Sequence, residues 1–257
     1  MSIWLYQDQC NSPEENTIRS DKCIFCKCNL KTIYKETSTW NNHIKEINVC
    51  PICGWWAIWE SSSNIVLKND RLSFNLYGTS AVLKKLSLMD IEQPIDEIRQ
   101  YLLVKYEDRF TMHPRLFEET VESVFKNIGF QTIITSYHND GGIDVILNDG
   151  ISEIGVQVKR YKDSIQVSQI REFLGALIEN GMTHGIFVTT SKFQKGAYNS
   201  IEKFSEQKYK IELMDSDRFY DALKLSGRNL YKNYEDFKDT YGDIELSTVY
   251  EDESDYS

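Results

Sequence analysis

Two short apolar runs that carry polar side chains at fixed positions constrain the fold of this chain most strongly. The first run, residues 143–147, contains Asp144, and the second, residues 154–159, contains Gln157 and Lys159. Alternate side chains of a strand share a face, so we expect Gln157 and Lys159 to face a cleft while the aliphatic residues between them enter a core. If the two runs are neighbouring strands, the Asp144 carboxylate lies close to both.

This combination of side chains is suited to phosphodiester hydrolysis. A carboxylate and an amide oxygen are ligands for a hard cation such as Mg²⁺, which keeps several waters and is held by few protein groups. The Lys159 ammonium would orient a water or offset charge that develops on the phosphate oxygens. The alternative is an ordinary strand pair that ends in a solvated Lys159 and Arg160, but the spacing of both runs favours the site.

An apolar stripe at helical spacing precedes the first of these runs and consists of Phe117, Val121, Val124 and Ile128. Glu118 lies beside the stripe, whereas Glu119 falls on the side expected to face water. Glu118 is therefore the better candidate for an auxiliary acid. A solvated helix carboxylate is the alternative, because charged helix faces are common.

Beyond residue 160 the pattern continues as a layered α/β core. Apolar positions over 170–178 predict a helix in which Gly175 and Ala176 are small enough to pack closely on a sheet. A buried strand over 185–189 follows, then a helix, a strand over 210–214 and a last helix capped by Asp215. Polar residues lie at the end of the buried strand, namely Thr189, Thr190 and Ser191. They are candidates for phosphate contact, but helix capping is the better supported role.

From about His113 to Leu225 the chain resembles the catalytic domain of the Mrr-type restriction endonucleases, a branch of the PD-(D/E)xK nuclease superfamily. The matching stretches are residues 117–119, 140–145, 156–161 and 185–191. The resemblance implies an α/β fold with a restriction-endonuclease-like αβββαβ core, in which helices flank a central mixed sheet. It also implies Mg²⁺-dependent DNA cleavage, with Glu118 as the auxiliary acid and with a catalytic set formed by Asp144, Gln157 and Lys159. Mrr-type domains carry Gln where most of the superfamily has Glu, so Gln157 fits this branch.

The same resemblance implies a prokaryotic enzyme of the type IV restriction kind that acts against foreign or modified DNA. DNA is then the main partner, and an activating defence-system protein is a further candidate. Cutting both strands with one site per chain favours a homo-oligomer. Two alternatives stay open: a DNA-binding or partner-binding module that cleaves little, and a repair or junction nuclease. The intact set of Asp144, Gln157 and Lys159 argues against the binding module.

Four cysteines in the first part of the chain predict a structural zinc site. The two Cys-x-x-Cys pairs, separated by 23 residues, are Cys23 with Cys26 and Cys50 with Cys53. This is the two-knuckle spacing of a zinc ribbon, and four thiolates would close the zinc coordination shell. Four reduced core cysteines are the alternative, but they do not explain the paired spacing. Cys28 and the weaker His43 compete as ligands, and Cys10 is expected to remain a free thiol.

Tryptophans gather around these pairs, namely Trp40, Trp55, Trp56 and Trp59. A small ribbon needs such side chains to build a core. A surface on which bases stack is the competing interpretation, and nearby lysines make a nucleic-acid contact compatible with it.

These observations divide the chain into four parts. We expect a zinc ribbon over 1–62, a connecting strand and helix over 63–112, an Mrr-type nuclease domain over 113–226 and an acidic tail over 227–257. The net charge of −10 is concentrated in the tail, where residues 232–257 hold nine acidic residues against two lysines. The tail either solubilises the protein or mimics DNA. Basic residues cluster instead in and after the catalytic motifs, as Lys159, Arg160, Lys162, Lys192 and Lys195.

The start of the chain has neither a basic segment nor a long apolar stretch, and no run approaches the roughly 20 apolar residues that span a bilayer. We therefore expect a soluble, cytoplasmic protein with no membrane partner.

Overall fold

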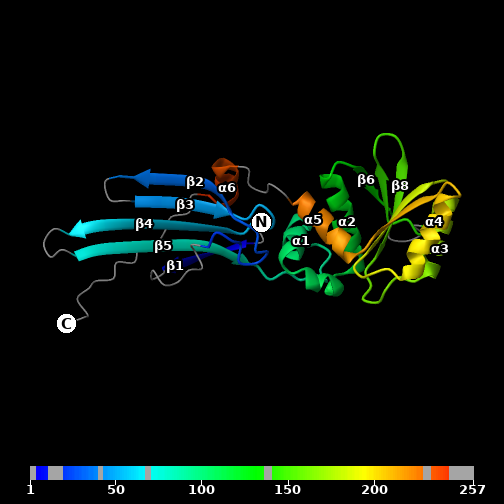
Figure 1. Cartoon of the computed structure of the whole chain (residues 1–257), viewed down its shortest axis with the longest axis horizontal. Helices are drawn as coiled ribbons and strands as arrows, with labels where there is room; N and C mark the ends of the chain where they lie inside the picture. Colours follow the sequence, from blue (N-terminus) through cyan, green and yellow to red (C-terminus); the bar gives the residue numbers. More distant parts are fainter. Residues whose placement is uncertain are drawn as a thin grey trace. The chain divides into compact units, whose positions relative to one another are not determined.

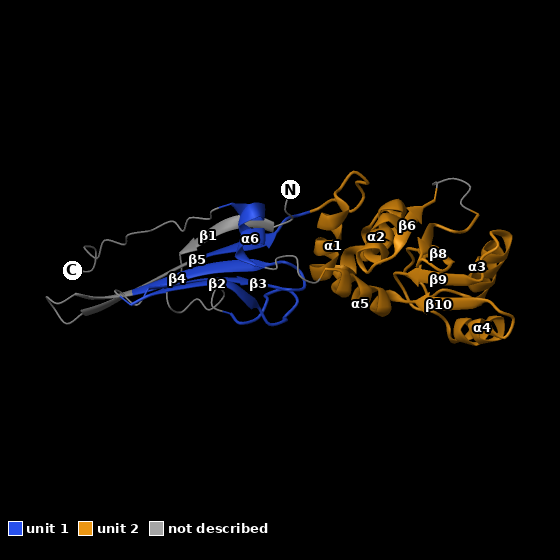
Figure 2. Cartoon of the chain, turned by 90° about the horizontal axis from the view of Figure 1, so that it is seen from above, with its two compact units in different colours: residues 1–85, 228–257 blue, residues 86–227 orange. Residues whose placement is uncertain are grey.

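The computed structural model describes residues 4–10, 20–39, 43–66, 71–135, 141–227 and 233–242, with side chains except in 4–10 and 63–77. The chain forms two compact units, shown in Figure 2. Unit 1 comprises residues 1–85 and 228–257, and unit 2 comprises residues 86–227. Each unit has its own sheet.

Unit 1 contains a five-stranded antiparallel sheet in the order β1-β5-β4-β3-β2. The strands are β1 (Trp4–Cys10), β2 (Lys31–Ser38), β3 (His43–Val49), β4 (Trp56–Val66) and β5 (Arg71–Leu83). The cysteine pairs lie just before β2 and between β3 and β4. The strand order therefore brings both pairs to the same region of the sheet, because β2 and β3 are neighbours.

A short helix, α6 (Tyr234–Tyr241), packs on one face of this sheet through aromatic side chains. The ring of the buried Trp56 lies 5.2 Å from the ring of Phe237 and 5.0 Å from that of Tyr241. The first turn of α6 also contacts the sheet, because the rings of Tyr234 and Tyr34 are 4.6 Å apart. Part of the acidic C-terminal segment therefore belongs to the packed structure of unit 1.

Unit 2 is built on a five-stranded mixed sheet in the order β10-β9-β8-β7-β6. Its strands are β6 (Gln131–Ile134), β7 (Val145–Asn148), β8 (Glu153–Lys159), β9 (His184–Thr189) and β10 (Lys210–Met214). The pairs β6 with β7 and β7 with β8 are antiparallel, whereas β9 is parallel to both β8 and β10. The central strand β8 therefore joins the antiparallel part of the sheet to the parallel part.

Helices cover both faces of this sheet (Figure 1). On one side lie α2 (Pro114–Asn127) and α5 (Ser216–Ser226), and on the other lie α3 (Val167–Glu179) and α4 (Lys195–Ser205). The helix α1 (Ile95–Val104) and the 3-10 helix η1 (Tyr106–Thr111) precede α2. The order α2-β6-β7-β8-α3-β9 is the αβββαβ core expected from the sequence, so the fold class is confirmed.

Local sequence signals account for several of these boundaries. Pro114 occupies the first turn of α2, where its missing N–H costs nothing, and His113 accepts a hydrogen bond from Arg115 N. Asp215 caps α5 as predicted by accepting from Arg218 N at 3.1 Å. The prediction that Ser191 caps a helix is wrong, because α4 begins after Gln194 and the Ser191 hydroxyl donates to Asp163 O.

Two glycines on neighbouring strands allow α3 to pack closely on the sheet. Gly155 of β8 is paired with Gly185 of β9. A Cβ atom at Gly155 would lie 2.8 Å from Leu177 of α3, and one at Gly185 would lie 2.7 Å from both Leu177 and Phe173. The expectation for Gly175 is corrected, since nothing lies within 4 Å of its Cβ position. The residues that provide the close approach are in the strands.

The division into units differs from the expected segment boundaries in the middle of the chain. Residues 63–85 fall in unit 1 and residues 86–112 in unit 2. The reason is strand pairing, because β5 runs antiparallel to β4 along most of its length and extends the first sheet as far as Leu83. None of the described helices is both long and apolar enough to cross a membrane.

We predict that Gly185→Ala lowers the free energy of unfolding of unit 2 by about 1–3 kcal/mol, because the added methyl group overpacks the contact with α3. Gly175→Ala is the matched control. It should be neutral or stabilising by up to about 1 kcal/mol, because alanine favours a helix interior. Urea unfolding of both variants provides the measurement, and equal effects would contradict the packing argument.

Candidate active site

Asp144 is held at the start of β7 by hydrogen bonds to β8. Its N–H donates to Val156 O at 2.8 Å, and its Oδ2 accepts from Val158 N at 2.6 Å. The side chain is buried, with 7% of the residue exposed. The turn before it requires positive φ at Gly141 and Gly142, which glycine adopts without strain. The carboxylate therefore takes the place of a backbone acceptor just before β7 begins.

Gln157 and Lys159 project from the same face of β8, as the alternation predicted. Gln157 is 8% exposed, and its Nε2 would lie 3.6 Å from a Cβ atom at Gly142. Lys159 is half-buried and is paired in register with Thr189 of β9. Among the described residues, neither the Gln157 amide nor the Lys159 ammonium has a hydrogen-bonding partner. Both groups are available for a ligand at the end of β8.

Glu118 is connected to the Asp144 backbone through Arg115 and Thr135. Arg115 Nη1 lies 3.2 Å from Glu118 Oε2 and donates to Thr135 O at the same distance. Thr135 in turn donates through its N–H and its hydroxyl to Asp144 O, at 3.0 and 2.8 Å. The Glu118 side chain is 16% exposed, against 31% for Glu119, which also pairs with Arg115. This ordering agrees with the preference for Glu118.

Arg115 was not singled out in the sequence, although it precedes Glu118 by three residues and Glu119 by four. Such spacings place side chains next to each other on a helix. Its guanidinium binds both carboxylates and the Thr135 carbonyl, so it fixes the first turn of α2 against the residue that follows β6.

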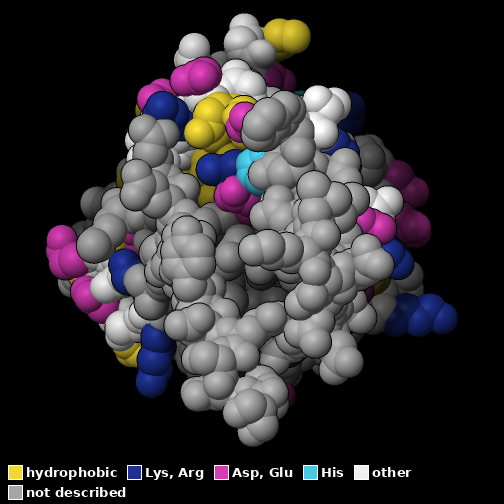
Figure 3. Space-filling view, turned by 90° about the vertical axis from the view of Figure 1, so that its left-hand side faces the viewer, with side chains coloured by type: hydrophobic (Ala, Val, Ile, Leu, Met, Phe, Trp, Pro, Cys, Tyr) yellow, Lys and Arg dark blue, Asp and Glu magenta, His cyan; other side chains and the backbone are white. Residues whose placement is uncertain are grey.

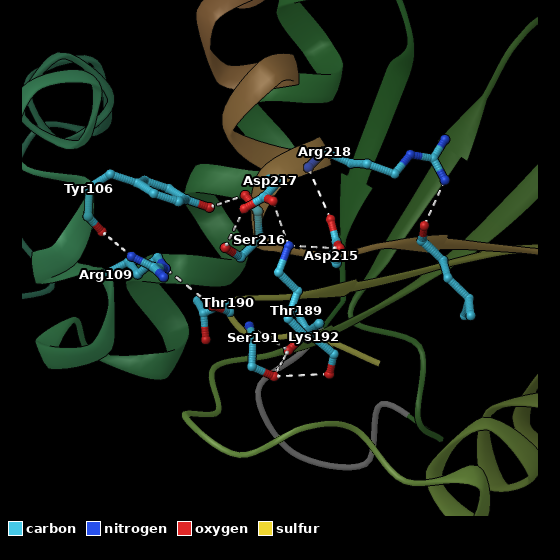
Figure 4. A network of polar contacts seen from close by, with 11 residues as sticks. Tyr106, Arg109, Thr189, Thr190, Ser191, Lys192, Asp215, Ser216, Asp217 and Arg218 are labelled. Atoms are coloured by element: carbon cyan, nitrogen blue, oxygen red, sulfur yellow. Dashed lines mark hydrogen bonds and ion pairs between the residues drawn. The ribbon is translucent and has the colours of Figure 1, made fainter. Parts of the chain in front are cut away.

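The polar residues at the end of β9 bind the backbone at and after the end of β8. Thr189, Thr190 and Ser191 are all buried. Thr189 Oγ1 donates to Lys159 O at 2.9 Å, and Thr190 Oγ1 donates to Tyr161 O at 2.7 Å. Figure 4 shows that this segment lies between the start of α5 and Arg109, whose Nε donates to Thr190 O. These hydroxyls hold the chain around Lys159 in place.

The basic cluster expected near the catalytic motifs is partly neutralised. Lys192 lies 3.1 Å from Asp215 Oδ2 and 2.6 Å from Asp217 Oδ2 (Figure 4). Hydrogen bonding to Asp217, and then to Asp215, raises the pKa of the Lys192 ammonium. Arg160 donates to Phe110 O at 2.6 Å. Two cations near the end of β8 have no hydrogen-bonding or ion-pair partner among the described residues. They are Lys159, the last residue of β8, and the exposed Lys162.

The donor set at the start of β7 and the end of β8 fits a hard divalent cation. It offers an oriented carboxylate from Asp144 and a buried amide from Gln157, and oxygen ligands of this kind suit Mg²⁺.

Comparison with known proteins finds relatives of the stretch that contains this site. Residues 110–223 match a family model of the Mrr catalytic type, described as restriction endonuclease. A stretch of 137 residues is 26% identical to the type IV methyl-directed restriction enzyme EcoKMrr of Escherichia coli, covering 50% of this chain and 44% of that protein. Residues 110–223 are therefore similar to the catalytic domain of the Mrr-type restriction endonucleases.

Two further likenesses accompany this match. A protein of Sinorhizobium fredii, y4cE, is 28% identical over 103 residues, which cover 38% of this chain and 26% of the relative. The chain thus spans less than half of the length of either curated relative. The solved structure of the MspJI restriction endonuclease in complex with a 27-mer oligonucleotide is 14% identical, with a TM-score of 0.39, and covers 83% of this chain and 62% of that one.

The matched stretch of the Mrr-type domain contains Glu118, Asp144, Gln157 and Lys159, and it therefore spans the whole predicted active site. The resemblance expected from the sequence is confirmed. The cysteines lie outside the stretch, so the family match carries no information about them.

The four predicted cysteines form one cluster in unit 1. The Sγ atoms of Cys23, Cys26, Cys50 and Cys53 all lie within 4.8 Å of one another. Individual separations are 3.3 Å for Cys26 and Cys50, and 3.6 Å for Cys23 and Cys53. Tetrahedral zinc with Zn–S bonds of about 2.3 Å requires sulfur separations of roughly 3.8 Å. The cluster is compatible with a zinc ribbon, although the sheet of unit 1 is larger than that of a small ribbon.

The two cysteine pairs have the same local backbone. The first cysteine of each pair donates its N–H to the carbonyl five residues later, Cys23 to Cys28 and Cys50 to Trp55. The residue after each second cysteine has positive φ, 60° at Lys27 and 77° at Gly54. Cys50 Sγ also accepts from Cys53 N at 3.3 Å. Such turns aim paired sulfurs at one point, which is the geometry that a metal site requires.

Two competing ligands are placed differently from this cluster. Cys28 Sγ lies 3.2 Å from Cys50 Sγ but is not among the four mutually close sulfurs, and partial burial raises the pKa of its thiol to about 11. His43 pairs with Glu60 across β3 and β4.

The face shown in Figure 3 carries described side chains of both charge signs close together. The side chains of Cys10, Trp40 and Asp140 fall outside the described residues.

Asp144 is predicted to support the fold as well as the site. Asp144→Ala should lower the free energy of unfolding by about 1–3 kcal/mol, because the buried Val158 N–H loses its acceptor. Asp144→Asn is the matched control, since its amide oxygen still accepts this hydrogen bond. Hydrogen exchange of the Val158 amide should be faster in Asp144→Ala only. Equal protection in both variants would show that the carboxylate does not have this role.

The cysteine geometry predicts which substitutions release a metal. Replacing Cys50 and Cys53 together by serine should abolish bound zinc, because half of the thiolate ligands are lost. Unit 2 should stay folded, since it has a separate core. Cys28→Ser is the control and should retain zinc. Elemental analysis of purified protein measures this, and a double variant with undiminished zinc would contradict the assignment.

Proposed function

We propose that this protein is a Mg²⁺-dependent DNA endonuclease that hydrolyses phosphodiester bonds in foreign or modified DNA. The observation that carries the proposal is the placement of Asp144 at the start of β7 beside Gln157 and Lys159 at the end of β8, within a stretch that matches a restriction endonuclease family. Asp144 and Gln157 supply oxygen ligands, and Lys159 supplies a cation without a partner among the described residues.

Each side chain has a separate role in this proposal. Asp144 and Gln157 would hold Mg²⁺, which when bound makes a water acidic and neutralises phosphate charge. The Lys159 ammonium would stabilise charge that develops on the phosphate oxygens, an effect that is greatest in the transition state. The hydrogen bonds from Thr189 and Thr190 to the backbone around Lys159 support this, because they fix the strand from which the lysine projects.

Glu118 would act as an auxiliary acid that adds negative charge near the Mg²⁺ site. Its ion pair with Arg115 orients it, and the Arg115 contact with Thr135 O connects it to the Asp144 backbone. Glu118 would therefore act on the Mg²⁺ site less directly than Asp144. Replacing Glu118 should reduce the rate of DNA cleavage less than replacing Asp144.

The wider biological role follows from the same proposal. Cleavage of foreign DNA would serve prokaryotic antiviral defence and would take place in the cytoplasm. Two cuts in a duplex would require two sites, so a homo-oligomer is proposed, with an activating defence protein as a further partner. Zn²⁺ at the four cysteines would be structural, because four thiolates leave no open coordination position.

Lys159→Ala should reduce the rate of DNA cleavage by about 10²- to 10³-fold, because the lysine acts mainly on the transition state. DNA affinity should change little. The assay uses plasmids that carry different base modifications, with Mg²⁺ or with EDTA, and it follows nicking and linearisation.

Lys203→Ala is the matched control, since Lys203 is exposed on α4 and lies outside the basic cluster. It should cleave at the rate of the unaltered protein. If Lys159→Ala and Lys203→Ala are equally active, the site assignment is wrong. If the unaltered protein cleaves none of the plasmids in Mg²⁺, the nuclease proposal fails.

A further inference from the structure

Unit 1 contains a pocket that the proposed nuclease chemistry does not use. Its volume is about 640 Å³, and it lies between the hairpin that carries the first cysteine pair and strands β2 to β4. Binding sites for small molecules typically measure about 300–1,000 Å³. The pocket is thus large enough for an organic ligand. We call it the Trp59 pocket after the aromatic side chain that lines it among the described residues.

Trp59 differs from the other described tryptophans. Trp55 and Trp56 are buried, with 1% and 0% exposed, whereas Trp59 is only partly buried. Trp56 and Trp59 lie three residues apart on β4, so their side chains point to opposite faces of the sheet. The Trp56 face is covered by α6. The Trp59 indole therefore lines the pocket on the other face, and Trp59 is paired in register with Gly78 of β5.

Polar side chains surround the indole. The Thr32 hydroxyl donates to Asn48 Oδ1 at 2.7 Å, which turns the Asn48 amide nitrogen away from Thr32. Among the described residues that nitrogen has no partner. Glu46, which is paired with Trp59 in register, adds a carboxylate whose charge is balanced by Lys35 at 2.5 Å. The pocket thus combines a flat aromatic surface with a hydrogen-bond donor and an acceptor.

The hairpin that forms the opposite wall adds a cation and depends on the cysteine cluster. A bridge between Lys22 and Asn29 closes the hairpin, and both residues line the pocket. Cys23 and Cys26 lie between them. The sulfurs that meet Cys50 and Cys53 therefore fix the position of this wall relative to β3 and β4. Lys22 is exposed and can reach an anionic group at the mouth of the pocket.

We propose that the Trp59 pocket binds a nucleobase that is not stacked in a duplex. The indole would stack on the base, Asn48 and Glu46 would bond its polar edge, and Lys22 would contact the attached phosphate. An unstacked base can come from a DNA strand or from a free nucleotide, and both present the same chemistry. The strand source rests on the proposed function as a DNA endonuclease, and the pocket would then place the nuclease on its substrate.

The test measures binding by fluorescence anisotropy, without added Mg²⁺, to a short labelled single-stranded oligonucleotide. An abasic strand of the same length is the second probe. The unaltered chain should bind the strand with bases more tightly than the abasic strand. Trp59→Ala should lose about 10- to 100-fold in affinity for the former only, since stacking on an aromatic side chain contributes about 1–3 kcal/mol per base. Trp59→Phe should retain most of the affinity.

Further variants separate a binding role from a structural one. Asn48→Ala should weaken binding of the base-bearing strand while the chain retains its zinc, and Thr37→Ala, at an exposed position of β2 outside the pocket, should have no effect. Competition by free deoxynucleotides at the affinity of the strand would identify a free nucleotide as the source. Equal binding of both strands, or unchanged affinity in both Trp59→Ala and Asn48→Ala, would overturn the proposal.

This outcome is independent of the nuclease assay. If the protein cleaves plasmids but binds the base-bearing and abasic strands equally, the proposed nuclease function stands and the proposal for the Trp59 pocket fails. If the protein binds bases through Trp59 but cleaves none of the plasmids, the proposal for the Trp59 pocket stands and the proposed nuclease function fails.

Discussion

The hydrogen bond from Val158 N to Asp144 Oδ2 is the interaction on which the candidate active site depends. At this point β7 has not yet begun, and β8 would otherwise have a buried N–H without an acceptor. A buried amide without a partner is costly, so a side-chain oxygen is needed here for the fold itself. The fold thereby fixes the orientation of the carboxylate before any ligand arrives. Because this hydrogen bond also stabilises the fold, a substitution of Asp144 is expected to affect both the sheet and the candidate active site.

The position of β8 at the junction of the sheet explains why the remaining polar groups gather there. On one side it pairs with the antiparallel β7, which delivers Asp144. On the other side it runs parallel to β9, whose threonines bind the backbone after Lys159. Parallel neighbours end at the same edge of a sheet, so the loop after β9 is available to support the end of β8. The backbone at and after Lys159 is thus held by buried hydroxyl groups.

Much of this could be predicted from local pattern, and the exceptions share a physical cause. Period-two alternation located β7 and β8 with their polar side chains, and helical spacing located α2 and α3. Asp215 was identified as a cap because capping is local. Ser191 was misjudged, since its hydroxyl binds Asp163 O, a partner 28 residues away. The close contact of α3 was assigned to Gly175, whereas it depends on Gly155 and Gly185 in strands that meet only after folding.

The same reasoning applies to the two interpretations of the tryptophans in unit 1. Composition alone offered a core or a stacking surface, because both need large aromatic side chains. Strand parity separates them, since residues an odd number apart on β4 point to opposite faces. One face is closed by aromatic rings of α6, which come from the far end of the sequence. A core role for Trp56 therefore leaves Trp59 on the face that α6 does not cover, and a single strand can supply both a core residue and a binding surface.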